Sequence, residues 1–184
     1  MERRTKLRVI AVAGIAILIA ALLLLSIFDL RITGTRVEMQ SMDASGLADS
    51  MQYYRLAQKQ PDSAAEQIVR KDNPYPTQDP SCYRDVYVYV DIKNSGFLNR
   101  KIYDAVIDSE MDDDSRIILR DGCLVTQSVG AFKQSNGVYA AHMVLYTEDM
   151  TDDQISEYLK AIDFKLITSG RSQVFRLESA VFSF

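Results

Sequence analysis

An acidic segment in the second half of the chain is the most site-like feature of the sequence. Carboxylates at alternate positions supply the hard oxygen ligands that Ca²⁺ takes in proteins. A calcium loop of the EF-hand type does not fit, because Asp113 stands at its glycine position and Leu119 at its terminal glutamate position. We favour the alternative interpretation, a solvated hairpin tip, since most charge clusters are solvated. The candidate calcium ligands are Asp108, Glu110, Asp112 and Asp114.

Tyrosine is frequent in the chain, with ten residues against no tryptophan. Tyr87 and Tyr89 alternate with valines and therefore share one face of a strand, and Tyr83 lies close by. An exposed tyrosine row can stack on sugars or dock a protein, because the side chain joins a flat apolar ring to a hydroxyl group. The commoner structural role is cross-strand pairing or cover by a helix. We take Tyr83, Tyr87 and Tyr89 as the candidate partner surface.

The chain has two cysteines, Cys82 and Cys123, and one histidine, His142. In an oxidising compartment the two cysteines can form a disulfide, which we favour over two buried thiols. The bond would close a loop of about forty residues and add ~3–4 kcal/mol on the chain-entropy model. Two cysteines and one histidine are too few ligands for a structural zinc site. His142 has no partner at a catalytic spacing, so the sequence predicts no catalytic residue and no cofactor besides the possible Ca²⁺.

These residues follow an apolar stretch over positions 9–28, which holds no charge. As a helix it would span about 30 Å, the thickness of a bilayer's hydrocarbon core. The stretch is longer than the apolar region of a cleaved signal peptide and lacks a small-x-small pattern near its end. It is therefore predicted to be an uncleaved signal-anchor. The basic residues on its N-terminal side outnumber those just beyond it; these are Arg3, Arg4, Lys6 and Arg8 against Arg31 and Arg36.

That charge bias predicts a cytoplasmic tail at 1–8 and an extracytoplasmic domain at 29–184, on a single-pass cell-membrane protein. Beyond the tail, 17 basic and 24 acidic residues remain, a net charge of −7. An acidic domain without a basic stripe repels phosphate backbones, so nucleic acid is excluded as a partner.

The outer domain combines one helical region with many short strands. Apolar residues at helical spacing predict a helix over 45–60, and capping-box spacing predicts a second over 64–71, so 45–71 forms a helical insertion. Residues 73–80 hold three prolines and are predicted to form a stiff connector. Thr151 and Gln154 predict the start of another short helix. Strands are expected at 30–40, 85–92, 101–108, 116–119, 123–127, 163–168 and 173–184, with a hairpin in 131–146 turning at Asn136-Gly137.

Seven or eight short strands with one apolar face each are typical of a mainly β fold, an antiparallel sandwich. The stretch YVYVDIKNSGFLNRKIYDAVID resembles the early strands of FxLYD-like immunoglobulin-like domains of membrane-anchored bacterial surface proteins. The likeness covers about 84–184 and implies an extracytoplasmic binding or spacer module without a defined ligand. The helical insertion departs from it.

The predicted function is binding, without catalysis, at the cell surface. Its partner would be another envelope protein or a surface glycan. The alternative is a subunit of an envelope assembly, such as a secretion, pilus-like or sporulation machine, in which the span itself makes the contacts. An enzyme ranks third, because no acid, base and nucleophile converge in the sequence.

Overall fold

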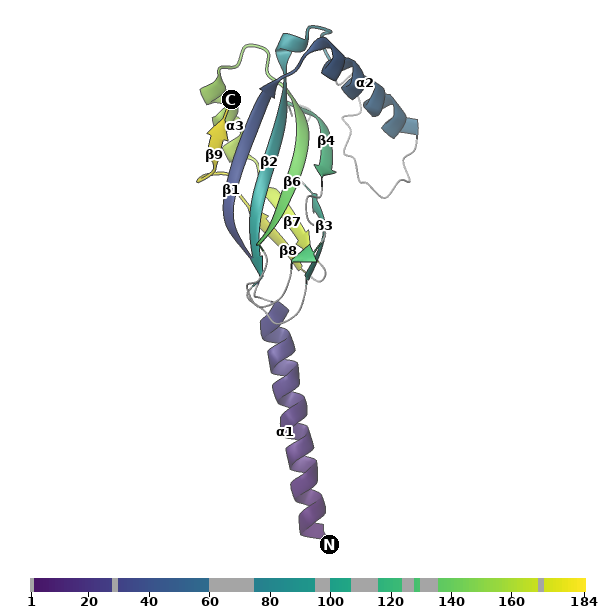
Figure 1. The fold of residues 1–184 in the computed structure, drawn as a ribbon, viewed down its shortest axis with the longest axis vertical. Helices are drawn as coiled ribbons and strands as arrows, with labels where there is room; N and C mark the ends of the chain where they lie inside the picture. The colour runs from purple at the N-terminus through teal and green to yellow at the C-terminus, as the bar shows by residue number, and fades with distance from the viewer. Residues whose placement is uncertain are drawn as a thin grey trace.

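The part of the chain that the computed structural model describes holds a long N-terminal helix, two β-sheets and shorter helices packed on the sheets (Figure 1). The described residues are 2–27, 30–59, 75–94, 100–106, 116–123, 128–129, 136–168 and 171–184. Helix α1 (Glu2–Ile27) stands below the sheets, and strand β1 begins at Leu30, three residues after the helix ends. No helix of the described residues is both long and apolar enough to cross a membrane. On α1, the side chains that the structure describes are those of residues 8 and 10–22.

Five strands form the first sheet, in the order β4-β6-β2-β1-β9. Neighbouring strands are antiparallel except for β9, which runs parallel to β1. The expectation of a purely antiparallel fold is therefore wrong at this edge. The chain crosses over from the second sheet before β9, and this brings β9 to β1 in the parallel sense. The strands are β1 (Leu30–Ser41), β2 (Tyr83–Asn94), β4 (Ile117–Cys123), β6 (Asn136–Tyr146) and β9 (Val181–Ser183).

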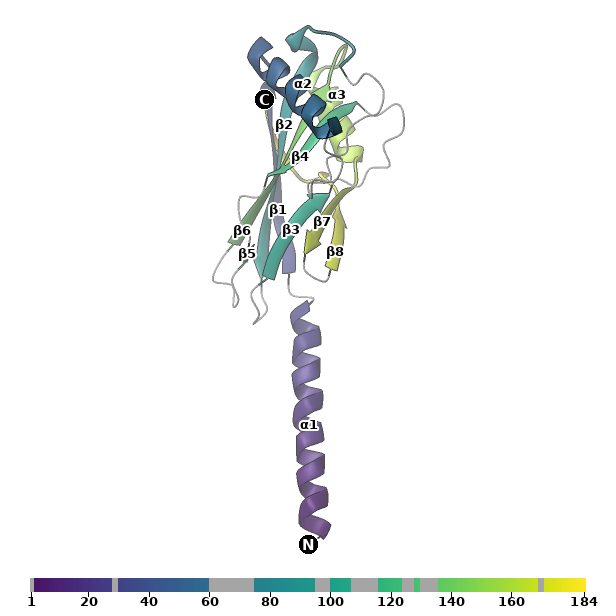
Figure 2. The same ribbon diagram turned by 90° about the vertical axis from the view of Figure 1, so that its right-hand side faces the viewer.

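Four shorter strands form the second sheet, in the order β5-β3-β7-β8 (Figure 2). They are β3 (Arg100–Val106), β5 (Ser128–Val129), β7 (Phe164–Thr168) and β8 (Arg171–Phe175). Phe164 and Leu166 of β7 pack in one core with Val37 of β1 and Met143 of β6, so the two sheets share a buried interior. The predicted mainly β class is confirmed.

Strand β2 lies in the middle of the first sheet and follows the predicted alternation. Val86, Val88, Val90 and Ile92 are all buried in the core, while the residues between them lie on the other face. Each fully buried aliphatic side chain contributes about 1.5–3 kcal/mol relative to an exposed one. This row therefore fixes the register of β2, because a one-residue slip would move all four side chains out of the core.

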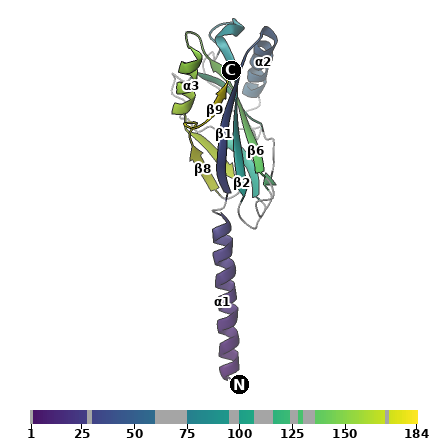
Figure 3. The same cartoon turned by 60° about the vertical axis from the view of Figure 1, so that its left-hand side comes forward.

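Two helices pack at the end of the sheets that lies away from α1, on opposite sides (Figure 3). Helix α3 (Asp152–Ala161) begins with the predicted capping box, in which Thr151 and Gln154 bond each other's backbone. Its residues Ile155 and Leu159 enter the main core. Helix α2 (Ala44–Lys59) confirms the first helix of the predicted insertion. The second, at 64–71, lies outside the described residues.

Helix α2 packs on the outer face of the first sheet, the face opposite the valine row. Leu47 of the helix meets Tyr83, Ile118 and Val144 of the sheet in a second, smaller buried cluster. The short 3₁₀ helix Pro80–Cys82 begins at the last residue of the connector that the sequence predicted at 73–80. Pro80 suits the first position of this helix, because a backbone amide there would have no partner within the helix.

The predicted turn at Asn136-Gly137 and the predicted break between strands 116–119 and 123–127 both lie inside strands instead. Asn136 and Gly137 pair with Lys93 and Ile92 in the first sheet, and Asp121 and Gly122 pair with His142 and Ala141. In both cases long-range strand pairing overrides the local turn preference. The single strand expected at 173–184 is two strands, β8 and β9, separated by a turn in which the Ala180 amide bonds the Leu177 carbonyl.

Candidate functional site

The outer face of the first sheet carries a line of planar side chains that α2 leaves uncovered. We call it the aromatic row; it consists of Arg36 on β1, Tyr89 and Tyr87 on β2, and His142 on β6. Strand register places Arg36 opposite Tyr89 and Tyr87 opposite His142, so the row crosses three strands. All four side chains are half-buried.

Each member of the aromatic row stacks on the next. The Cζ atom of Arg36 lies 4.3 Å from the centroid of the Tyr89 ring, a cation–π contact. The Tyr89 and Tyr87 ring centroids are 6.5 Å apart with planes 24° from parallel. The Tyr87 and His142 rings are closer, at 4.7 Å and 29°. The planes of neighbouring rings therefore lie within 30° of parallel along the row.

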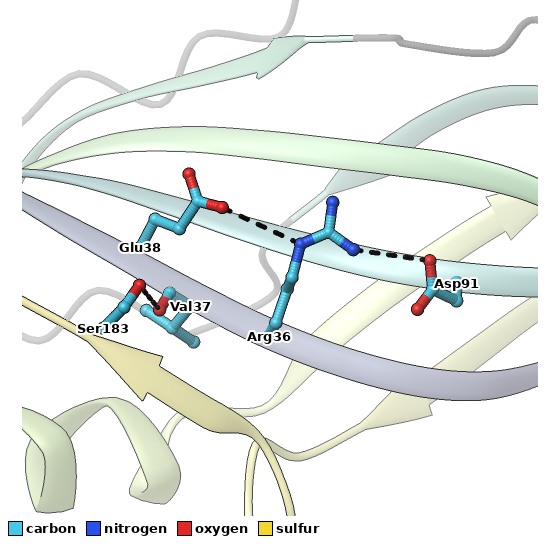
Figure 4. A network of polar contacts seen from close by, with 5 residues as sticks. All are labelled: Arg36, Val37, Glu38, Asp91 and Ser183. Carbon is cyan, nitrogen blue, oxygen red and sulfur yellow. Dashed lines mark hydrogen bonds and ion pairs between the residues drawn. The ribbon is translucent and has the colours of Figure 1, made fainter.

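Carboxylates flank the arginine end of the row. The guanidinium of Arg36 lies 3.6 Å from Oδ1 of Asp91 and 3.8 Å from Oε1 of Glu38 (Figure 4). These side chains are about two-fifths exposed, so each ion pair contributes at most about 1 kcal/mol. Burial, and then the hydrogen bond to Glu38, raise the pKa of Tyr89. The tyrosine consequently stays neutral and donates to the carboxylate.

A third carboxylate, that of Asp85, holds the histidine end of the row. The Nε2 atom of His142 lies 3.0 Å from Oδ1 of Asp85, and the two side chains are 22% and 25% exposed. A histidine oriented by a carboxylate is also part of many catalytic sites, where a nucleophile completes the set. Here the pair lies half-buried on the outer face of the sheet and its imidazole stacks on Tyr87, which suits a positioned contact surface. The sequence shows no partner for His142 at a catalytic spacing, because Asp85 lies 57 residues away on another strand.

Tyr83 does not belong to this surface, so that part of the prediction is wrong. Its side chain is fully buried under α2, next to Leu47 and Val144. The hydroxyl donates to the carbonyl oxygen of Thr77 at 2.6 Å and accepts from the Thr77 amide at 3.2 Å. Tyr83 points to the same side of β2 as Tyr87, but the helical insertion covers this end of the strand.

Four tyrosines, one of them on α2, pack in a continuous cluster where the helix meets the first sheet. Ring centroids are 5.9 Å apart for Tyr54 and Tyr75, 5.8 Å for Tyr75 and Tyr83, and 5.5 Å for Tyr83 and Tyr146. The Tyr75 hydroxyl also shares a short hydrogen bond with Ser50 of the helix. Burial raises the pKa of both Tyr75 and Tyr83. This cluster fastens the insertion to the sheet, the structural role that sequence analysis favoured for the tyrosines.

The predicted disulfide is contradicted by the positions of the two cysteines. Cys82 is a free thiol. Tyr83, the next residue, pairs with Tyr146 of β6, whereas Cys123 pairs with Ala140. Six residues of an extended strand separate these levels by about 20 Å, far beyond the ~7 Å between Cα atoms that a disulfide allows. The sequence could not show this, because it does not give the register of β4 on β6.

The predicted calcium ligands Asp108, Glu110, Asp112 and Asp114 lie outside the described residues, and the calcium site stays a prediction. Within the described ranges, no group of three or more His, Cys, Asp and Glu side chains is arranged to hold a metal ion.

Comparison with known proteins adds no relative to this description: no family model, curated protein or solved structure matches the chain.

Proposed function

We propose that this chain is a membrane-anchored binding module, without catalytic activity, whose partner docks on the aromatic row. The observation that carries the proposal is the row itself, a set of half-exposed, mutually stacked side chains on a sheet face that α2 covers at one end only. Tyrosine and arginine are the residues that most often dominate binding energy at protein interfaces. Stacking and ion pairs hold these side chains in place, so little side-chain entropy would be lost on binding.

The anchor in this proposal is α1. Its 26 residues form one helix, and apolar side chains point outward around it, with Ile10 71% and Ile17 70% exposed. Water would penalise such a surface, whereas the interior of a bilayer would not. The uncharged stretch at 9–28 and the basic residues before it favour insertion with the N-terminus in the cytoplasm and the sheets outside.

The geometry of the row favours a protein partner over a surface glycan. A sugar stacks on an open aromatic face. In the row, Arg36 and Tyr87 flank the Tyr89 ring, and Tyr89 and His142 flank the Tyr87 ring. The partner would therefore meet these flanked rings together with the charges of Arg36, Glu38 and Asp91, which is the mixed surface that protein interfaces use.

In-cell crosslinking of the full-length protein, followed by identification of the crosslinked proteins, tests this proposal. Replacement of both tyrosines by alanine (Y87A/Y89A) should reduce the yield of the main crosslinked partner at least tenfold, since each aromatic hot spot contributes 1–2 kcal/mol or more. Val174→Ala is the matched control, because Val174 is exposed on β8 of the other sheet. Equal yields from the wild type and Y87A/Y89A would refute docking on the row.

The second candidate function is a subunit of an envelope assembly that makes its contacts through α1. The helix carries small residues on its exposed surface, and a Cβ atom added to Gly14 would meet nothing within 4 Å. Small residues allow helices to approach closely in a bilayer. Exchange of residues 9–28 for an unrelated span should leave a surface-binding module active and disable an assembly subunit. The resemblance to FxLYD-like domains stays a prediction, and neither proposal depends on it.

A further inference from the structure

The described strand ends next to α1 carry a group of basic residues, although the domain as a whole is acidic. The strand ends that lie there are the starts of β1, β3, β6 and β8 and the ends of β2 and β7 (Figures 1 and 2). Within the outermost three residues of each of these described strands, every charged residue is basic. They are Arg31, Lys93, Arg100, Lys101 and Arg171.

Two of these basic residues face each other directly. Arg31 on β1 is the register partner of Lys93 on β2, so their side chains lie on the same face of the sheet. Arg31 is exposed and Lys93 half-exposed. No carboxylate of the described residues forms an ion pair with either. Like charges directly opposite each other destabilise a strand pair, so an anion bound close to both residues would stabilise this arrangement.

The opposite end of the domain carries the opposite charge. Glu148 and Asp149 form the turn after β6, and Asp152, Asp153 and Glu157 lie on the exposed side of α3. These residues lie at the far end from α1 (Figure 3). These five acidic residues are therefore remote from the helix, whereas Arg31 and Lys93 are close to it. Since β1 begins three residues after α1 ends, Arg31 lies within about 15 Å of the end of the helix.

We propose that this basic end binds the phosphate groups of anionic phospholipids in the bilayer that holds α1, with Arg31 and Lys93 as the central contacts. The inference rests on the proposed anchor, because α1 brings this end to the headgroup layer. Basic residues next to a span are attracted to anionic headgroups, and the attraction fades within a Debye length. The contact would hold the sheets upright and leave the aromatic row facing sideways, accessible to a partner on the same membrane.

The test compares the full-length chain in nanodiscs of phosphatidylcholine alone and of phosphatidylcholine with phosphatidylglycerol. The melting temperature should be higher in the anionic discs by roughly 4 °C, because a ligand bound only by the folded state raises Tm. High salt should remove the difference. The variant R31Q/K93Q should melt at one temperature in both discs, and R31E/K93E should melt lower in the anionic ones.

The control variant R55Q/K160Q removes two positive charges from α2 and α3, far from α1, and should keep the wild-type difference. If the chain does not insert into neutral discs, the anchor is wrong and the lipid contact falls with it. If it inserts but melts at the same temperature in both discs, only the lipid contact is wrong. A difference that persists in R31Q/K93Q would also overturn the assignment.

Discussion

The hydroxyl group of Tyr83 makes two hydrogen bonds with the backbone of Thr77, donating to its carbonyl oxygen and accepting from its amide. A single side chain thereby fixes the end of the connector against the first sheet. The tyrosine ring fills the second core cluster under α2. This residue is therefore structural, whereas Tyr89, six positions later on the same strand, belongs to the candidate binding surface.

The variant Tyr83→Phe should lower the free energy of unfolding by about 1–2 kcal/mol, because it leaves both backbone groups of Thr77 without this partner. Tyr89→Phe is the matched control on the exposed face and should change stability by less than about 0.5 kcal/mol. Urea unfolding of the full chain in detergent measures both. Equal effects of the two variants would contradict the burial difference.

Stability should fall as the pH rises above about 10. Burial raises the pKa of Tyr75 and Tyr83 above the ordinary value of 10.0. Below that value the tyrosines are protonated in the folded and unfolded states alike, and their contribution is fully present. Above it, the unfolded chain loses these protons first, so the equilibrium moves towards unfolding until the folded pKa is passed.

Thermal unfolding between pH 8 and 11 measures this dependence. The variant Y75F/Y83F has no phenol at either position and should show a shallower decline above pH 10 than the wild type. A decline of the same steepness in both proteins would assign the alkaline effect to other groups.

Loss of the capping box should destabilise α3. In Thr151→Ala the Gln154 amide loses its acceptor, and the expected cost is about 0.5–2 kcal/mol. Thr151→Ser keeps the acceptor oxygen and should lie close to the wild type. Because Ile155 and Leu159 anchor the helix in the core, the loss should appear in global unfolding. No change in the midpoint for Thr151→Ala would contradict the cap.

Reducing agent should leave the melting temperature unchanged, since Cys82 is a free thiol and about six strand residues separate it from the level of Cys123. Mass spectrometry after thiol alkylation without reduction should find two modified cysteines in the unfolded chain. One disulfide per chain, or a lower Tm on reduction, would restore the original prediction from the sequence.

Local patterns of the sequence predicted the elements that depend on local chemistry. The valine alternation of β2, the apolar spacing of α2 and the capping box of α3 all have short-range physical causes. Strand pairing is different, because it joins residues far apart in the chain. Asn136-Gly137 has ideal hairpin chemistry yet lies within β6, where pairing with β2 outweighs it. The parallel position of β9 beside β1 likewise leaves no local signal.

The residues of the candidate site likewise divide into those that the local sequence predicts and those that only the fold brings together. Tyr87 and Tyr89 could be found from alternation alone, and they are the centre of the aromatic row. The other contacts of the row join different strands, so they could be found only from the fold. Arg36 of β1 lies over Tyr89 of β2, and His142 of β6 pairs with Asp85 of β2. Tyr83 has the correct position for the surface but is covered by α2, and the sequence gives no sign of where a helix packs.

A photoreactive amino acid at position 89, incorporated into the full-length protein in cells, tests the central claim most directly. Position 174, exposed on the second sheet, serves as the matched site for non-specific capture. The proposal predicts one main protein adduct from position 89, absent from position 174 and at least tenfold weaker when His142 and Tyr87 are alanine. The same adducts in equal yield from both positions would contradict the aromatic row as a binding surface.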